Sequence, residues 1–171
     1  MNNSGFIDMS SIQILVFFAL VIIIAVYVTV TNNKRKQQTI IKKLKNGWGK
    51  PAQRKYSSED YECISHYFKR NADENSIDDI TWNDLGMDDV FRMMNNTNSS
   101  AGQEYLYKML RSPSADILTL KKLDKLASDF DKNADKRLDI QKIFVWIGRA
   151  KHISISDYCD VVVGLEKKSN I

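Results

Sequence analysis

The sequence is poor in the residues that define several protein classes. Its 171 residues include two prolines and seven glycines, too few for a collagen-like chain, and two cysteines, too few for a disulfide scaffold. Hydrophobic residues make up 43% of the chain, which excludes a wholly disordered polypeptide. This composition fits one or two small domains.

A nucleotide-binding phosphate loop is also missing. The G-x-x-x-x-G-K-[ST] pattern fails at Gly49-Lys50, because Pro51 follows and the upstream glycine position is Leu44. We therefore expect no nucleotide hydrolysis by this chain alone and no ATP or Mg²⁺ bound to it.

Residues suited to catalysis or metal binding are few and scattered. His66 and His152 lie far apart without ligand spacing, and Cys63 and Cys159 form no C-x-x-C motif. Packing or surface roles explain all four residues, so we predict no catalytic, cofactor-binding or metal-binding residue.

One segment imitates a calcium loop. Residues 131–142 follow the EF-hand pattern at positions 1, 3, 5, 8 and 9. However, position 6 is Lys136 instead of glycine, and position 12 is Lys142 instead of the bidentate glutamate. We interpret the segment as a polar turn between two helices.

Charge is missing from one long run near the N-terminus. Residues 12–30 contain no charged side chain and are almost entirely apolar. Nineteen residues are close to the roughly 20 that a helix needs to cross a bilayer. We predict a transmembrane helix over 12–30, preceded by a short extracytoplasmic segment over 1–11.

Acidic residues are absent from the segment that follows. Residues 32–55 carry nine bases and no acid, whereas residues 56–171 carry sixteen bases and twenty acids. Six of the nine bases are the ones closest to the apolar run and form the predicted membrane-surface set: Lys34, Arg35, Lys36, Lys42, Lys43 and Lys45. Topology and attraction to anionic lipid explain these bases better than a nucleic-acid site does.

This asymmetry predicts the orientation of the chain. Lysine and arginine beside a span mark its cytoplasmic end, and a cleaved signal would carry its bases before the apolar core. We therefore expect an uncleaved, single-pass cell-membrane protein with its N-terminus outside. The basic juxtamembrane segment, 31–55, and a cytoplasmic domain, 56–171, would follow.

The cytoplasmic part is predicted to be all-α. Helical periodicity and capping signals divide it into six short amphipathic helices with starts at Ser57, Thr81, Ser100 and Ser114, a fifth around Leu138 to Gly148, and a last start at Ser156. So few short helices bury a modest core, and their apolar stripes are expected to stay partly exposed without further protein.

A set of positions in this region matches a known pattern. The pattern is D-x-x-T-x-x-x-L, then a helix, then T-x-[ST]-x-x-G, a leucine-rich helix and a proline. The matching residues are Thr81, Leu85, Thr97, Ser99, Gly102, Leu110 and Pro113. In this respect residues 78–148 resemble the start of the helical core domain of MutS-type mismatch-repair ATPases.

Physically, these positions describe a scaffold. Gly102, in the first turn of a helix, permits close approach of a neighbouring backbone, and Thr97 and Ser99 can satisfy free backbone groups before it. None of them is a catalytic group.

The resemblance, with a membrane span replacing the mismatch-reading domain, implies the membrane-anchored MutS-like group of bacterial proteins. ATP and Mg²⁺ would belong to a C-terminal ATPase domain outside this chain, and DNA binding is implied by the family alone. The chain would act as membrane tether and helical scaffold, with the bilayer, a second copy or the ATPase domain as partners. The alternative is a complete single-pass adaptor whose helical domain binds a cytoplasmic partner.

Overall fold

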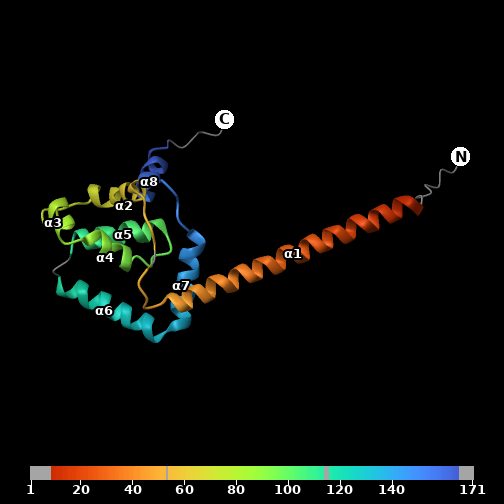
Figure 1. Ribbon diagram of the computed structural model, residues 1–171, viewed down its shortest axis with the longest axis horizontal. Helices are drawn as coiled ribbons and strands as arrows, with labels where there is room; N and C mark the ends of the chain where they lie inside the picture. Colours follow the sequence, from red (N-terminus) through yellow and green to blue (C-terminus); the bar gives the residue numbers. More distant parts are fainter. Residues whose placement is uncertain (1–8, 53, 114–115, 166–171) are drawn as a thin grey trace. The chain divides into compact units, whose positions relative to one another are not determined.

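The computed structural model describes residues 9–52, 54–113 and 116–165. Over these residues it is all-α, with eight helices and no strand (Figure 1). The chain divides into two compact units, Met1–Asn46 and Gly47–Ile171. The predicted all-helical class is therefore confirmed for the described residues.

The first unit is dominated by one long helix. α1 runs over Met9–Gly47 without a break, through the apolar run and the basic segment. It contains an 18-residue stretch with a mean hydropathy of 3.0, and by length and composition the helix could be a membrane anchor or a signal sequence. The six predicted surface bases, Lys34 to Lys45, all lie exposed on its C-terminal half.

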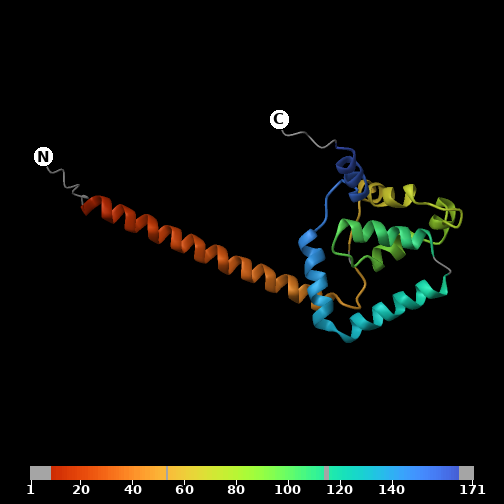
Figure 2. The ribbon, with the colours of Figure 1, turned by 180° about the vertical axis from the view of Figure 1, so that it is seen from behind.

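Seven shorter helices form the second unit. Their bounds are α2 Ser58–Arg70, α3 Asp79–Asp84, α4 Met87–Met94, α5 Ser100–Arg111, α6 Ile117–Lys132, α7 Ala134–Ile147 and α8 Ile155–Gly164. In both views α5 lies between α2 and α4, and it packs on both (Figures 1 and 2). Most of the packing of α6 is against α7.

The helix starts follow local hydrogen bonding. Ser57 forms the predicted capping box with Asp60, since each side chain bonds the other residue's backbone N–H. Three other predicted starts are displaced: Asp78 caps α3 instead of Thr81, Ser99 caps α5 instead of Ser100, and Ser154 precedes α8 instead of Ser156. Ser114 lies outside the described residues, and Asp116 caps α6.

A segment that was predicted to form one helix forms two. The segment from Thr81 to Met94 is interrupted at Gly86, whose φ of 60° lies in the left-handed region. α3 ends just before this turn and α4 begins just after it. A single glycine therefore turns one amphipathic stripe into two short helices.

The core is aromatic and lies between α2, α3, α4 and α5. Its buried side chains are Ile64, Phe68, Trp82, Phe91 and Tyr107. Tyr107 is in ring contact with three of them, with centroid distances of 6.1 Å to Phe68, 5.1 Å to Trp82 and 5.4 Å to Phe91. Burial raises the pKa of Tyr107, and Arg111 opposes that shift.

Arg111 is buried within this cluster. Its guanidinium carbon lies 4.3 Å from the Trp82 ring centre and 5.1 Å from that of Phe68. It donates to the Tyr107 hydroxyl at 3.0 Å, the Ile77 carbonyl at 3.0 Å and the Asp79 carboxylate at 2.6 Å. The positive charge of Arg111 is thus stabilised by aromatic rings and oxygen acceptors that come from three parts of the chain.

The last three helices leave apolar side chains uncovered. Within α6 and α8 no described residue is buried, and in α7 Leu138 alone is. Trp146 at the end of α7 is 87% exposed. The predicted exposed stripes are present, and they are concentrated on α6, α7 and α8.

The segment that imitates a calcium loop is a tight turn. α6 ends at Lys132, Asn133 caps both helices, and α7 begins at Ala134. Positions 4 to 12 of the imitated loop are therefore helical, as the interpretation of a helix–helix turn predicts.

Replacing the buried arginine should destabilise the second unit. We expect Arg111→Ala to lower the free energy of unfolding by about 3 kcal/mol, because several charge-assisted hydrogen bonds and ring contacts are lost together. Arg92→Ala, which removes an exposed pair with Asp89, should cost about 0.5 kcal/mol. Urea unfolding of the full chain in detergent, followed by circular dichroism, compares the two. Equal losses would contradict a central role for Arg111.

Candidate functional site

Three of the seven motif residues meet in the turn between α4 and α5. Ser99 accepts a hydrogen bond from Gly102 N at 3.2 Å, so it satisfies a free backbone group as expected, and it caps α5 in place of the predicted Ser100. A Cβ at Gly102 would lie 3.1 Å from Ser99 Oγ and 3.2 Å from Thr97 Cβ. The close approach to Gly102 therefore comes from side chains of the turn, not from the neighbouring backbone that was expected.

Asn95, which was not among the predicted site residues, organises this turn. It is fully buried, and its Oδ1 accepts from Thr97 Oγ1 at 2.5 Å and from Thr97 N at 3.3 Å. Its Nδ2 donates to the Tyr56 hydroxyl at 2.7 Å. Thr97 therefore bonds a side chain instead of capping free backbone groups. An asparagine directly after a helix was the available signal.

The remaining motif residues lie apart from this turn. Thr81 is in the first turn of α3, where its N–H bonds Asp78, and Leu85 is the exposed C-cap of the same helix. Leu110 packs against the aromatic core, and Pro113 follows the end of α5 at Arg111. The structure brings together Thr97, Ser99 and Gly102, and it leaves the other four at separate places.

A hollow of about 380 Å³ adjoins the α4–α5 turn. Thr97, Ser99 and Gly102 line one side, and Phe130, Ile140 and Phe144 from α6 and α7 line the other. Trp48 closes one part, since Arg137 stacks on it at 3.9 Å and its Nε1 donates to Asp131 at 3.2 Å. Apolar and polar side chains line the hollow in equal number.

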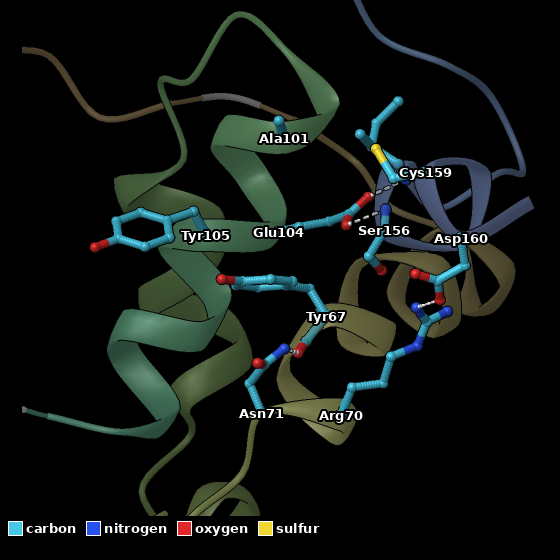
Figure 3. A pocket seen from close by; sticks show the side chains of 10 residues that line it. Tyr67, Arg70, Asn71, Ala101, Glu104, Tyr105, Ser156, Cys159 and Asp160 are labelled. Atoms are coloured by element: carbon cyan, nitrogen blue, oxygen red, sulfur yellow. Dashed lines mark hydrogen bonds and ion pairs between the residues drawn. The ribbon is translucent and has the colours of Figure 1, made fainter. Parts of the chain in front are cut away.

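A second hollow, the α2–α5–α8 groove, has a volume of about 660 Å³. Figure 3 shows Tyr67 and Tyr105 along it, with Glu104 reaching toward Ser156 and Arg70 reaching toward Asp160. The groove thus combines aromatic walls with charged groups at one end.

Glu104 fixes the position of α8. The carboxylate is buried on α5 and accepts from Ile155 N at 2.7 Å, Ser156 N at 3.3 Å and the Ser154 hydroxyl at 3.1 Å. It replaces the side-chain cap that Ser154 does not provide. The unpaired N–H groups at the N-terminus of a helix and the helix dipole both favour a carboxylate there. No sequence signal marked Glu104, because its partner is fifty residues away.

Charge pairs add a second link between α2 and α8. Arg70 pairs with Asp157 and Asp160, and His66 Nδ1 lies 2.5 Å from Asp157 Oδ2. His66 and Arg70 are one turn apart on α2, so their side chains lie on the same face of α2 and both reach Asp157 of α8. The histidine thus takes part in helix packing.

The two thiols differ in their surroundings. Cys63 is half-buried on α2, and burial together with nearby acids raises its pKa, which disfavours the reactive thiolate. Cys159 is exposed and lines the groove. Among the described residues, no group of three His, Cys, Asp or Glu side chains is placed to hold a metal ion.

Comparison with known proteins found no matching family model, no similar curated protein and no similar solved structure.

Removing the buried carboxylate should release α8. We expect Glu104→Ala to lower the free energy of unfolding by about 2 kcal/mol and to speed amide exchange at Ile155 and Ser156, because three donors lose their acceptor. Hydrogen exchange measured by mass spectrometry on the full chain tests this. Glu62→Ala, an exposed change on α2, is the control and should leave α8 protected. Unchanged exchange in α8 would contradict the capping role.

Proposed function

We propose that this chain is the membrane tether and helical scaffold of a MutS-like ATPase whose nucleotide-binding domain lies beyond Ile171. The observation that carries the proposal is the apolar surface left uncovered on α6, α7 and α8. A scaffold that is completed by further protein has such a surface.

The tether is α1. Its apolar run crosses the bilayer, and its exposed bases lie on the cytoplasmic side, where they also attract anionic lipid. Because the helix continues to Gly47, it extends about 25 Å beyond the apolar run at 1.5 Å per residue.

The turn at Thr97, Ser99 and Gly102 supports the MutS-like part of the proposal. These residues match the family pattern, and their tight packing gives a physical reason for a small residue at position 102. In this proposal ATP and Mg²⁺ act in the further domain, and DNA contact rests on the family resemblance alone.

A second candidate is a complete membrane adaptor that binds a partner in trans. It is favoured by α8, where Tyr158, Val161 and Val162 follow i, i+3, i+4 spacing and, like the C-cap Leu165, are about half exposed or more. Such a stripe suits docking of a helix from another chain. The two candidates differ in whether downstream sequence or another protein covers the apolar surface.

Sequencing the source DNA past codon 171 separates the candidates. The MutS-like proposal predicts a G-x-x-x-x-G-K-[ST] segment within a few hundred codons, in frame or one frameshift away. A stop codon after Ile171 with no such segment downstream would reject that proposal and favour the adaptor.

Membrane anchorage is tested by adding charge within the apolar run. Leu20→Arg combined with Val21→Arg should shift the chain from the membrane to the soluble fraction, because each central arginine costs about 3 kcal/mol on insertion. Asn32→Arg with Asn33→Arg adds the same charge after the run and should leave the chain in the membrane. An N-terminal tag retained on the mature protein distinguishes an anchor from a cleaved signal. Loss of the tag would contradict anchorage.

A further inference from the structure

Two basic segments border the α4–α5 turn. On one side, Ala52 N donates to Met93 O at 2.8 Å, and Asn96 Nδ2 donates to Lys50 O at 2.8 Å. On the other side, Arg149 donates to Thr97 O. Lys50, Ala52 and Arg149 therefore contact the turn or the end of α4 beside it, and they belong to two segments, 50–55 and 149–151, that are about a hundred residues apart in the sequence.

These segments carry five bases and no acid. We call them the turn bases: Lys50, Arg54, Lys55, Arg149 and Lys151. Within the described part of the chain none of the five forms an ion pair, whereas Arg70, Arg92 and Arg111 each pair with an aspartate. Glu59 approaches one segment, where its carboxylate lies 3.3 Å from His152. The two segments thus bring positive charge close to the turn, and Glu59 pairs with His152 instead of with any of the five bases.

Arg54 has an unused donor. Its side chain is half-buried, and its Nη1 is a buried side-chain nitrogen that finds no acceptor in the described structure. The guanidinium lies beside the Tyr56 phenol, where burial raises the tyrosine pKa and Arg54 opposes that shift. Leaving a charged donor without an acceptor is costly, so an acceptor that reaches Arg54 gains affinity.

A short polar chain connects the two arginines of the set. The Tyr56 hydroxyl bonds Asn95, Asn95 bonds the Thr97 hydroxyl, and Thr97 accepts from Arg149. This chain holds Tyr56 and Thr97 in fixed positions between Arg54 and Arg149. Asn95 is fully buried, so the residue that connects Tyr56 with Thr97 is itself held within the packed part of the unit.

We propose that the turn bases form a binding site for phosphate groups. Guanidinium groups suit phosphate, because their planar N–H donors match its oxygens in pairs, and the lysines add long-range attraction. The phosphate is carried either by a soluble polyanion or by the headgroup of an anionic lipid. This inference concerns residues outside the membrane-surface set and does not depend on the proposed function.

The experiment uses the full chain in nanodiscs. Inorganic tripolyphosphate, added to zwitterionic nanodiscs at ionic strength matched with sodium chloride, probes the soluble source. Nanodiscs containing phosphatidylglycerol, without tripolyphosphate, probe the lipid source. Hydrogen exchange at residues 95–99 locates binding, and isothermal titration gives the tripolyphosphate affinity.

Arg54→Gln and Arg149→Gln should each weaken tripolyphosphate binding by about tenfold. Lys55→Gln, on an exposed side chain, should weaken it by a smaller factor without disturbing the fold. The matched control is Lys121→Gln on α6, which removes the same charge away from the turn and should change the affinity by less than about twofold.

Protection of the turn by tripolyphosphate in zwitterionic discs, lost in the arginine variants, supports a soluble ligand. Protection found with phosphatidylglycerol discs and absent with tripolyphosphate supports a lipid headgroup. The proposal is overturned if neither probe protects the turn, or if Arg54→Gln, Arg149→Gln and Lys55→Gln behave like Lys121→Gln.

Discussion

The second unit depends on one buried guanidinium. Arg111 lies against the faces of Phe68 and Trp82 and bonds Tyr107, Ile77 and Asp79, so it connects α2, α5 and the segment that enters α3. A buried charge is stable when its donors find acceptors, and here each acceptor comes from an element that must be in place. The Ile77 N–H returns a bond to the Arg111 carbonyl at 2.7 Å, which ties the same two segments twice.

Much of the fold could be predicted from the sequence, because it rests on local patterns. Each of these patterns lies within one continuous stretch of sequence. They are the long apolar run, the breaks near Gly47 and Pro113, and the capping box at Ser57. Errors arose where several candidate caps stand side by side. Ser99 and Ser100 are adjacent, and either can cap a helix; the structure uses the second hydroxyl to bind Ala150 N at 2.8 Å instead.

The site could be predicted only in part, since its decisive contacts join distant segments. Asn95 and Glu104 carry no local signature of burial, yet one holds the α4–α5 turn and the other caps α8. The pattern Thr97, Ser99, Gly102 did mark a tightly packed place. The sequence pattern did not indicate that Arg54 and Arg149 lie near this turn, because only the folded chain brings these distant residues to it.

The unbroken course of α1 has a consequence for sequence change. A helix advances about 1.5 Å and turns about 100° with each residue, so an insertion after the apolar run rotates the helical residues that follow it about the helix axis. One extra residue between Thr31 and Asn46 would point the Gly47 end in a new direction, whereas about seven extra residues, close to two full turns, would nearly restore it. Changes in the length of α1 therefore change the direction in which its last residues point, and changes of about two turns nearly preserve that direction.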